Sequence, residues 1–330
     1  MPSLQSYHTF GLTSSSQQLA VFSSPDECRR AYSRATRNWV LGGGSNTLFL
    51  DDYDGQVLIN QITGITHHET SAGHRLRVGA GENWHELVTT CLQQGWHGME
   101  NLALIPGSVG ASPIQNIGAY GVEVKSFIEQ VEGVHLDTWQ PFTLSREECQ
   151  FGYRDSIFKH ALAGKVLISY VTFLLPTPAR AETSYGELAR LNAPTPAAIY
   201  DEVIRVRRAK LPDPAELGNA GSFFKNPVIS NAHFQTLKAR YDAVPGFAVD
   251  ESHTKVPAAW LIDRLGFKGK THHGVRCHPT QPLVLTNLGH ARGEDVTSLA
   301  KAIIVAVNET FNIQLEPEVR LVGREGLVHL

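Results

Sequence analysis

One short stretch, residues 218–227, combines side chains that can bind a ligand with one that can transfer a proton. Its sequence is GNAGSFFKNP. Ser222 carries the transferable proton, while Lys225 and Asn226 can bind an anion and a polar edge. The two glycines permit a tight turn or a close approach to a ligand. An ordinary surface loop has the same composition, so a functional interpretation needs support from other parts of the chain.

Charged residues elsewhere give that support. A basic run, RVRRAK, covers residues 205–210, and Glu316, Glu318 and Arg320 recur at a spacing of two near the C-terminus. In a strand, Glu318 and Arg320 would lie on one face. Arg154 stands between aromatic and small residues, which predicts a partly buried guanidinium that needs an anion partner. That partner is either a ligand or a nearby acidic side chain, and the sequence leaves both open.

Two glycine-rich segments are candidates for holding a cofactor. Residues 40–50 are typical of a strand, a glycine loop and a second strand, and the bare N–H groups of a triple glycine suit a diphosphate. The pattern is not a Rossmann fingerprint, because Thr47 stands where the third glycine would be, and a plain glycine hairpin is the alternative.

Residues 102–121 are too rich in Gly and Pro for a regular helix and too apolar for an exposed loop. A large polar cofactor would satisfy their buried backbone groups, and ordinary buried turns are the alternative.

Hydrophobic periodicity predicts the elements that must position these segments. Strands are expected at residues 75–78, 127–136, 166–173 and 284–286, and helices at residues 83–94, 195–208, 232–241, 257–265 and 294–311. The first 16 residues are polar and are expected to lie over the surface. A domain boundary is expected near Pro196, which suits the first position of a helix capped by Thr195.

Length and composition narrow the class of protein. A chain of 330 residues suggests about two domains, or three, at roughly 150 residues each. The net charge of −3 excludes a generally basic nucleic-acid binder. Four well-separated cysteines without a CxxC motif indicate reduced thiols in a cytosolic protein. The N-terminus does not resemble a signal peptide, and no apolar run reaches the roughly 18 residues of a membrane span.

A metal centre is the weakest of the candidate sites. His272, His273 and His278 lie near Cys277, but their spacing is not typical of zinc ligands. We therefore expect no metal.

Seven segments in a single order together resemble the UDP-N-acetylenolpyruvoylglucosamine reductase (UDP-N-acetylmuramate dehydrogenase) family. They are residues 41–47, 105–122, 152–156, 210–214, 218–227, 255–263 and 315–320, and they extend over nearly the whole chain. One glycine loop would be weak evidence, whereas seven collinear segments are specific. The segment around Tyr185 resembles the longer subtype of the family, in which a tyrosine loop covers the substrate.

The resemblance implies an α+β protein with an FAD-binding fold of the p-cresol methylhydroxylase type. FAD-binding subdomain 1 would comprise residues 1–60, with residues 313–330 returning to the active site. FAD-binding subdomain 2 would comprise residues 61–196. A third α+β subdomain, residues 206–312, would bind the nucleotide sugar.

The resemblance also implies roles for particular residues. The catalytic positions of the family match Ser222, Arg154 and Glu318. The segments that enclose a non-covalently held FAD match Gly42, Gly43, Gly44, Ser45, Asn46, Pro106, Gly107, Gln115, Asn116, Gly118 and Tyr120. The substrate-contact positions match Tyr185, Lys210, Asn226, Lys268, Gln281 and Arg320. Some relatives have a tyrosine near the substrate diphosphate where Phe247 aligns, so one hydrogen bond would be missing here.

The implied activity is that of an NADPH-dependent flavoenzyme of peptidoglycan precursor synthesis in the cytoplasm, and hence of cell wall biogenesis, cell shape, cell division and the cell cycle. It would reduce the enolpyruvyl group of UDP-N-acetylglucosamine-enolpyruvate to the lactyl ether of UDP-N-acetylmuramate. Hydride would pass from N5 of reduced FAD to C3, and Ser222 would protonate C2. Arg154 would bind the carboxylate with its planar fork. Glu318 would need a raised pKa, so that it donates a hydrogen bond instead of repelling that carboxylate, and Lys225 or water would return the proton to Ser222.

Two further alternatives stand beside the metalloenzyme at this point. Another FAD oxidoreductase of the same fold, acting on a small hydroxy acid, would keep the FAD segments but would not need both Ser222 and Glu318. A non-catalytic nucleotide-sugar binding protein would keep the Lys and Arg positions without the flavin. We expect a monomer that binds no nucleic acid and no membrane, and the sequence does not decide between NADPH and NADH.

Overall fold

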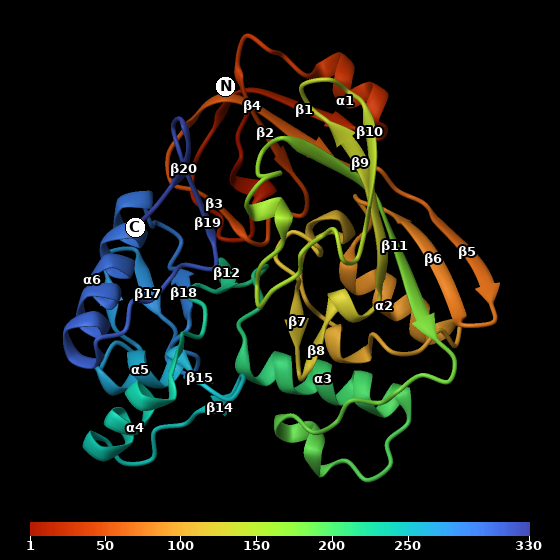
Figure 1. Ribbon diagram of the computed structural model, residues 1–330. Coiled ribbons are helices and arrows are strands. Elements are labelled where there is room, and N and C mark those ends of the chain that lie inside the picture. Colours follow the sequence, from red (N-terminus) through yellow and green to blue (C-terminus); the bar gives the residue numbers. More distant parts are fainter. The chain divides into compact units, whose positions relative to one another are not determined.

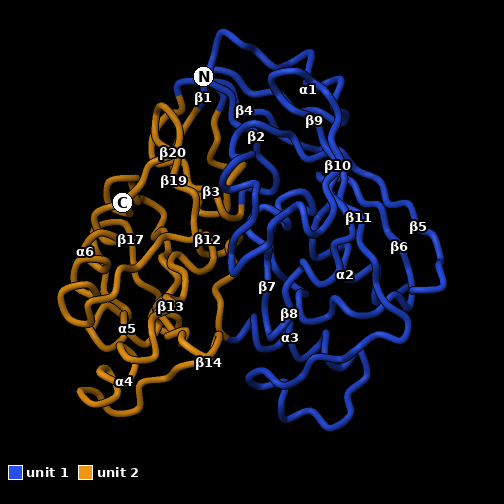
Figure 2. The backbone as a smooth tube through the Cα atoms, in the orientation of Figure 1, with its two compact units in different colours: residues 1–2, 16–44, 54–209 blue, residues 3–15, 45–53, 210–330 orange.

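The computed structural model describes residues 1–330. The chain forms two compact units and passes from one to the other several times (Figure 2). Unit 1 comprises residues 1–2, 16–44 and 54–209, and unit 2 comprises residues 3–15, 45–53 and 210–330. Both contain helices and strands, as the α+β prediction requires. The finer division into two FAD-binding subdomains and a third subdomain stays a prediction.

The main element of unit 1 is a five-stranded antiparallel sheet (Figure 1). Its strand order is β10 (Pro141–Ser145), β9 (Ile128–His135), β11 (Val166–Pro176), β6 (Gly73–Gly79) and β5 (Ile65–Thr70). Helix α2 (Trp84–Gln93) begins where the side chain of Asn83 accepts a hydrogen bond from the N–H of Glu86 at 3.1 Å. Trp84 then packs edge-on against Phe173 of β11, with ring centroids 5.9 Å apart, so α2 covers one face of the sheet.

A smaller sheet of unit 1 contains the strand that leads into the glycine loop. Its order is β1 (Ser16–Phe22), β4 (Tyr53–Asn60) and β2 (Arg37–Leu41), with β2 parallel to β4. Helix α1 (Pro25–Ala31) follows Ser24, whose hydroxyl accepts from the N–H of Glu27. Cys28 of α1 packs with Phe22 and Leu58 into a small core of its own. The strand after the loop belongs to a different sheet, so the loop is not a hairpin.

Residues 99–126 of unit 1 contain little regular structure, as the sequence predicts for residues 102–121. They form the short 3-10 turns η2 (Glu100–Leu102), η3 (Val109–Ala111) and η4 (Val124–Ser126) and the two-stranded hairpin of β7 (Gly118–Ala119) and β8 (Val122–Glu123). Further 3-10 turns are η1 (Gln5–Tyr7) in unit 2 and η5 (Ile157–Lys159) and η6 (Gly186–Arg190) in unit 1. Helix α3 (Pro196–Lys210) follows with Thr195 as its cap, because the Thr195 hydroxyl accepts from the N–H of Ala198 at 3.2 Å.

Unit 2 contains three small sheets and three helices. The sheets are β12 (Asn219–Ser222), β18 (Val284–Asn287), β17 (Val275–Cys277) and β16 (Thr271–His272); β13 (Val228–Ser230), β15 (His253–Lys255) and β14 (Phe247–Ala248); and β20 (Gly326–Val328), β19 (Arg320–Gly323) and β3 (Thr47–Phe49). The helices are α4 (Asn231–Arg240), α5 (Ala258–Arg264) and α6 (Gly293–Phe311). No helix of either unit combines the length and the apolarity needed to cross a membrane.

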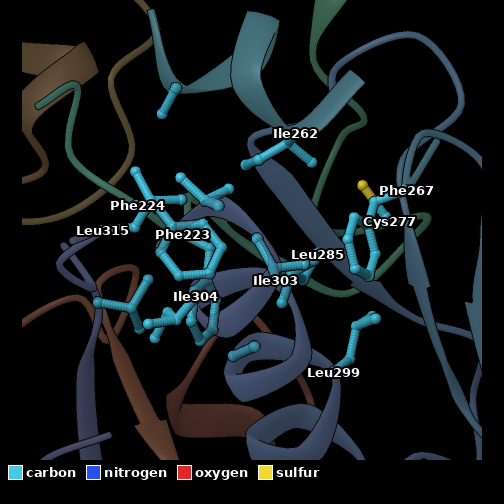
Figure 3. Packing of buried hydrophobic residues seen from close by; sticks show 14 of the residues in the cluster. Phe223, Phe224, Ile262, Phe267, Cys277, Leu285, Leu299, Ile303, Ile304 and Leu315 are labelled. Atoms are coloured by element: carbon cyan, nitrogen blue, oxygen red, sulfur yellow. The ribbon is translucent and has the colours of Figure 1, made fainter. Parts of the chain in front are cut away.

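The core of unit 2 includes the two phenylalanines of the 218–227 stretch (Figure 3). Phe223 and Phe224 are each 1% exposed, and their rings meet edge to face at 5.0 Å. Ile303 and Ile304 of α6 belong to the same cluster. Burying a phenylalanine side chain contributes roughly 1.5–3 kcal/mol. These rings therefore anchor the stretch to the core.

The first residues of the chain are not a surface covering, and that prediction is wrong. Leu4 and Phe10 are fully buried and Leu12 is 2% exposed. Phe10 and Leu12 share the core that holds Phe223. The sequence did not indicate this, because the apolar residues are scattered among polar ones without a helical or strand period.

The predicted regular elements are confirmed in type, with one correction near the C-terminus. The expected helices correspond to α2, α3, α4, α5 and α6, and the expected strands to β6, β9, β11 and β18. Strand β19 begins only at Arg320, so Glu318 precedes the strand instead of alternating within it. The short strands of unit 2 escaped prediction because two to four residues carry too little periodicity.

His8 makes the stability of unit 2 depend on pH. Its side chain is buried, and Nε2 lies 3.2 Å from the carbonyl oxygen of Leu12. Burial lowers its pKa from the ordinary value of 6.5 to about 4. Because the folded pKa is the lower one, the stabilising effect of the neutral ring is complete above about pH 6.5 and is lost as the pH falls toward 4.

We expect acidification from pH 7 to 4.5 to lower the free energy of unfolding by about 2–3 kcal/mol through His8 alone. Denaturant unfolding at a series of pH values measures this, and His8→Gln should flatten the slope over that window. His329→Gln, at an exposed histidine, is the control. The same slope in the wild type and in His8→Gln would contradict the assignment.

Candidate active site

Ser222 is the last residue of β12, and the residues before it fix its place in unit 2. The side-chain oxygen of Asn219 accepts a hydrogen bond from the N–H of Gly221 at 2.9 Å. Gly221 has a φ of +70°, which glycine adopts readily and other residues do not. A Cβ at Gly218 would lie 2.4 Å from the carbonyl oxygen of Phe10. The glycines of this stretch therefore serve its backbone path and its contact with the N-terminal segment.

Glu318 lies directly beside the Ser222 stretch. Its N–H donates to the carbonyl oxygen of Phe223 at 2.8 Å. Asn46 of the glycine loop also contacts Glu318. Its side-chain N–H₂ donates to the carbonyl oxygen of Glu318 at 3.2 Å. The carbonyl oxygen of Asn46 accepts from the N–H of Arg320 at 3.0 Å. Unit 2 thus brings together three segments that are far apart in the sequence and that each carry predicted site residues.

Arg320 begins β19, where it pairs in register with Thr47 of the parallel strand β3. Burial lowers the pKa of its guanidinium below the usual range. An arginine nevertheless stays protonated in proteins. Arg320 is therefore a cation held in surroundings of low polarity, where its attraction for an anion is stronger than in water.

Lys225 and Asn226 have protein partners in the structure. The ammonium group of Lys225 forms an ion pair with Glu316 at 3.2 Å. The side-chain oxygen of Asn226 accepts from the N–H of Ala258 at 2.9 Å, which satisfies the first turn of α5. A substrate contact by Asn226 would therefore use its amide N–H₂ group.

The other predicted substrate residues lie on loops and at element ends. Tyr185, in unit 1, is 46% exposed, and its ring lies edge-on to Tyr120 at 6.4 Å. Lys210 is the last residue of α3. Lys268 forms an exposed ion pair with Asp263, and Gln281 lies in the turn before β18. Their roles toward a substrate stay predictions.

Arg154 lies at the tip of a two-residue hairpin of unit 1, closed by hydrogen bonds between Gly152 and Asp155. Its φ is +53°, a conformation that costs a bulky residue roughly 1–3 kcal/mol. The guanidinium donates to the carbonyl oxygens of Gly118 at 2.5 Å and Asn116 at 3.4 Å. Strain of this kind persists where the surrounding structure imposes it, and it is concentrated at functional sites.

The side chain of Asn116 forms hydrogen bonds that hold this hairpin in place. It is fully buried and donates to the carbonyl oxygen of Gly152 at 2.8 Å and to the carboxylate of Glu123 at 3.1 Å. Its oxygen accepts from the N–H of Lys125 at 3.1 Å. The amide of Asn116 is therefore used in positioning Arg154, and its contact with FAD stays a prediction.

The glycine loop packs closely against the turn at residues 107–108. A Cβ at Gly42 would lie 2.3 Å from the hydroxyl oxygen of Ser108, and one at Gly43 would lie 2.8 Å from Cα of Gly107. Gly44, with a φ of +63°, is the one residue of the three whose φ is positive. The first two glycines are needed for close packing between the two segments that are expected to enclose FAD.

Two serines of the second segment suit a polar cofactor. The hydroxyls of Ser108 and Ser112 are buried and have no hydrogen-bond partner. A buried hydroxyl without a partner costs roughly 1–3 kcal/mol. Phosphate or sugar oxygens of a bound cofactor would satisfy both, so the residues present fit FAD. The predicted contacts Pro106, Gln115 and Tyr120 lie on the same segment.

The histidines near Cys277 do not form a metal centre. The thiol of Cys277 is buried, donates to the carbonyl oxygen of Pro282 at 3.2 Å, and has its pKa raised by burial to about 12. His278 accepts from the N–H of Gln281 at 3.2 Å. No three His, Cys, Asp or Glu side chains of the chain are placed to hold a metal ion.

Sequence reasoning missed the residues that position the site. Asn219 and Phe10 hold the Ser222 stretch, and Ser108 and Ser112 offer hydroxyls to the cofactor. A signal existed for the serines, because each stands within an apolar, glycine-rich run. None existed for Phe10, whose partner is more than 200 residues away in the chain.

Comparisons with known proteins agree along the whole chain. Residues 17–139 match the model of an FAD binding domain, and residues 213–322 match that of the C-terminal domain of UDP-N-acetylenolpyruvoylglucosamine reductase. The UDP-N-acetylenolpyruvoylglucosamine reductase of Pseudoalteromonas atlantica is 49% identical over 100% of this chain and 96% of its own length. That of Escherichia coli strain K12 is 44% identical over 99% and 97%. The crystal structure of the enzyme from Thermus caldophilus superposes with a TM-score of 0.65 and 25% identity over 96% of each chain.

The packing of the glycine loop predicts unequal effects of two alanine substitutions. Gly43→Ala should reduce FAD retention strongly, because the added methyl group meets backbone atoms of Gly107 that cannot move independently. Gly42→Ala should reduce it less, because its methyl group meets a hydroxyl that can rotate away. The ratio of flavin to protein absorbance in the purified variants measures this. Full flavin content and an unchanged melting temperature in Gly43→Ala would remove Gly43 from the cofactor site.

Proposed function

The chain belongs to the UDP-N-acetylenolpyruvoylglucosamine reductase family, and from this premise we propose how its own residues carry out the reaction. The protein is an FAD-dependent oxidoreductase that uses NADPH to reduce the enolpyruvyl group of UDP-N-acetylglucosamine-enolpyruvate, which gives UDP-N-acetylmuramate for peptidoglycan. The observation that carries this conclusion is the 49% identity over the full chain. An enzyme acting on a small hydroxy acid does not account for the match of residues 213–322.

The bound FAD supplies the hydride that passes from NADPH to C3 of the enolpyruvyl group. The protein must then stabilise negative charge at C2 and in the neighbouring carboxylate, and must deliver a proton to C2. Groups that are aimed at this charge before it develops contribute most to such a reaction.

Ser222 is the proposed proton donor to C2. Supporting this, its backbone is held by the turn at Asn219 and Gly221 and by the buried Phe223 that follows it. A hydroxyl is a weak acid in water, but C2 of such an intermediate is strongly basic. Return of the proton through Lys225 would require its exposed pair with Glu316 to open, which costs about 1 kcal/mol or less.

Arg154 is the proposed partner of the substrate carboxylate. Its planar fork matches two carboxylate oxygens, and lysine does not offer this geometry. The strained backbone and the hydrogen bonds to Gly118 and Asn116 fix the direction of the guanidinium. Positioning of this kind lowers the entropy lost when the substrate binds.

Glu318 is proposed to act in its protonated form. An ionised carboxylate close to the substrate carboxylate would repel it, whereas a neutral one donates a hydrogen bond. Its backbone N–H and carbonyl oxygen are both bonded, to Phe223 and Asn46, so its main chain is fixed in unit 2.

We assign binding of the nucleotide sugar to the residues that match the substrate-contact positions of the family. They are Tyr185, Lys210, Asn226, Lys268, Gln281 and Arg320. Phe247 is 46% exposed on β14, and without a hydroxyl it cannot donate a hydrogen bond to the diphosphate. The proposal extends to a monomer. It also extends to the cytoplasm, where thiols stay reduced, in agreement with four free, buried cysteines.

Arg154→Lys should lower turnover by roughly 10²-fold or more, the usual scale for losing a preorganised donor, although the charge is kept. Steady-state oxidation of NADPH in the presence of the enolpyruvyl nucleotide sugar measures it. Arg180→Lys, at an exposed loop position of the same unit, should be neutral. A near-normal rate in Arg154→Lys would return Arg154 to a structural role.

Ser222→Ala should separate the two half-reactions. Bleaching of the flavin by NADPH should stay nearly intact, while its reoxidation by the enolpyruvyl substrate should slow by the ~10²–10⁴ typical of a positioned general acid. Ser222→Cys should keep some activity, because a thiol also carries a proton. Stopped-flow absorbance of each half-reaction tests this, with Ser298→Ala, an exposed position on α6, as the control. Equal slowing of both halves would mean that Ser222 shapes the pocket and is not the acid.

A further inference from the structure

The side chain of Asn101 joins two segments of unit 1 that are far apart in the sequence. Asn101 is 2% exposed, and its side-chain N–H₂ donates to the carbonyl oxygen of Tyr120 at 2.9 Å and to that of Glu182 at 2.8 Å. Tyr120 belongs to the segment that is expected to enclose FAD. Glu182 lies shortly before Tyr185, which is expected to contact the substrate. One buried amide therefore links the predicted cofactor segment to the predicted substrate loop.

Asn101 is itself held in place by the core of unit 1. It is the middle residue of η2, between Glu100 and Leu102. The carbonyl oxygen of Leu102 accepts from the indole N–H of Trp84 at 2.9 Å, and the carboxylate of Glu100 accepts from the N–H of Gly98 at 2.8 Å. Leu102 and Trp84 are at most 1% exposed. The amide of Asn101 is thus a fixed point to which a loop can be attached.

Residues 177–187, the Tyr185 loop, follow β11 and include no buried residue. A loop of this kind opens locally at little cost, because few apolar contacts are lost. The carboxylate of Glu182 accepts hydrogen bonds from the N–H and the hydroxyl of Ser184. These bonds shape the chain within the loop, but they do not attach it to the rest of unit 1. The bond from Asn101 to the carbonyl oxygen of Glu182 does so.

Side-chain contacts show that the Tyr185 loop packs against the end of the predicted cofactor segment. The rings of Tyr120 and Tyr185 meet edge-on, with centroids 6.4 Å apart. A Cβ at Gly121, whose φ is +84°, would lie 3.1 Å from Cγ of Glu182. The amide of Asn101 bridges the two backbones at this contact.

We propose that Asn101 is a positioning residue, which holds the Tyr185 loop in the conformation that binds the enolpyruvyl nucleotide sugar. This rests on the proposed function, in which Tyr185 contacts that substrate. Without the amide, the carbonyl oxygens of Tyr120 and Glu182 lose a buried donor, and the loop spends only part of its time in the binding conformation. The apparent affinity for the substrate falls by that fraction. Asn101 acts through Tyr185 and makes no contact with the substrate itself.

The first test is the dissociation constant of UDP-N-acetylglucosamine-enolpyruvate for the oxidised, FAD-bound protein, followed by the flavin absorbance. Asn101→Ala should raise it roughly tenfold, which corresponds to a loop in place for about a tenth of the time. Asn101→Ser keeps one donor and should fall between alanine and the wild type. Asn38→Ala is the matched control, because the N–H₂ of Asn38 on β2 also donates to two carbonyl oxygens, those of Ser33 and Thr36. It should leave the constant unchanged.

A double-mutant cycle shows whether Asn101 acts through Tyr185. Tyr185→Ala alone should weaken binding of the same nucleotide sugar. Adding Asn101→Ala to that variant should have little further effect, because the side chain that is positioned is already gone. Fully additive effects would overturn the proposal.

Trypsin cleavage after Arg180 reports on the Tyr185 loop in the absence of substrate. Arg180 is exposed, and the rate of cleavage follows the population of the opened loop when opening is fast. FAD-bound Asn101→Ala should be cut several times faster than the wild type, and Asn38→Ala should match the wild type.

Other outcomes would overturn the proposal in distinguishable ways. Unchanged binding and unchanged cleavage in Asn101→Ala would leave Asn101 a structural residue. Faster cleavage with unchanged binding would show that the loop it holds does not serve this substrate. Failure of both Asn101 variants to purify with FAD, while Asn38→Ala does, would assign Asn101 to folding or to the cofactor. Failure of the proposed function would appear instead in the wild type, as a protein that does not bind the enolpyruvyl nucleotide sugar.

Discussion

The hydrogen bonds that join Phe223, Glu318 and Asn46 are the constraint on which the arrangement of unit 2 depends. The N–H of Glu318 donates to the carbonyl oxygen of Phe223, and the N–H of Lys225 donates to that of Glu316. Asn46 donates to the carbonyl oxygen of Glu318 through its side chain and accepts from the N–H of Arg320 through its own carbonyl oxygen. Three segments separated by up to 272 residues are thereby fixed to one another. The buried rings of Phe223 and Phe224 anchor this ladder in the core of unit 2 (Figure 3). Glu318 takes part in these bonds through its backbone N–H and carbonyl oxygen.

In unit 1, hydrogen bonds of a buried side chain keep Arg154 in place. A hairpin of two residues gives little buried area, so its shape depends on the fully buried amide of Asn116, which bonds to Gly152 and Glu123. This support maintains a φ of +53° that a free arginine would avoid. Gly107, which belongs to the same irregular segment as Asn116, lies so close to the glycine loop that Gly43 has no room for a Cβ. Close packing between backbones, more than turn geometry, explains why these positions are glycine.

The sequence revealed the parts of this structure whose information is local. Helix α6 repeats apolar residues over 19 positions, and the glycine-rich segments differ in composition from their surroundings, so both could be predicted. The burial of Phe10 could not, because its partners lie near residues 218 and 287. The strain at Arg154 could not either, since a positive φ is usually indicated by Gly or Asn. Composition alone left residues 218–227 as a loop, and the order of seven segments was needed to assign them a function.

The sequence does not show whether a charged side chain has a partner of opposite charge. The arginines of α3 differ in this respect. Arg205 and Arg207 lie two positions apart on α3, yet Arg205 is paired with Glu202 and exposed, while Arg207 has a covered, unpartnered Nε. A surface pair contributes about 0–1 kcal/mol, so the protein could lose the first with little effect. A cation without a counter-charge lowers the stability of the free protein and raises its affinity for an anion by the same interaction. Arg207, whose pKa is lowered by burial, therefore reduces the stability of the unliganded fold while strengthening the attraction of an anion that binds beside it.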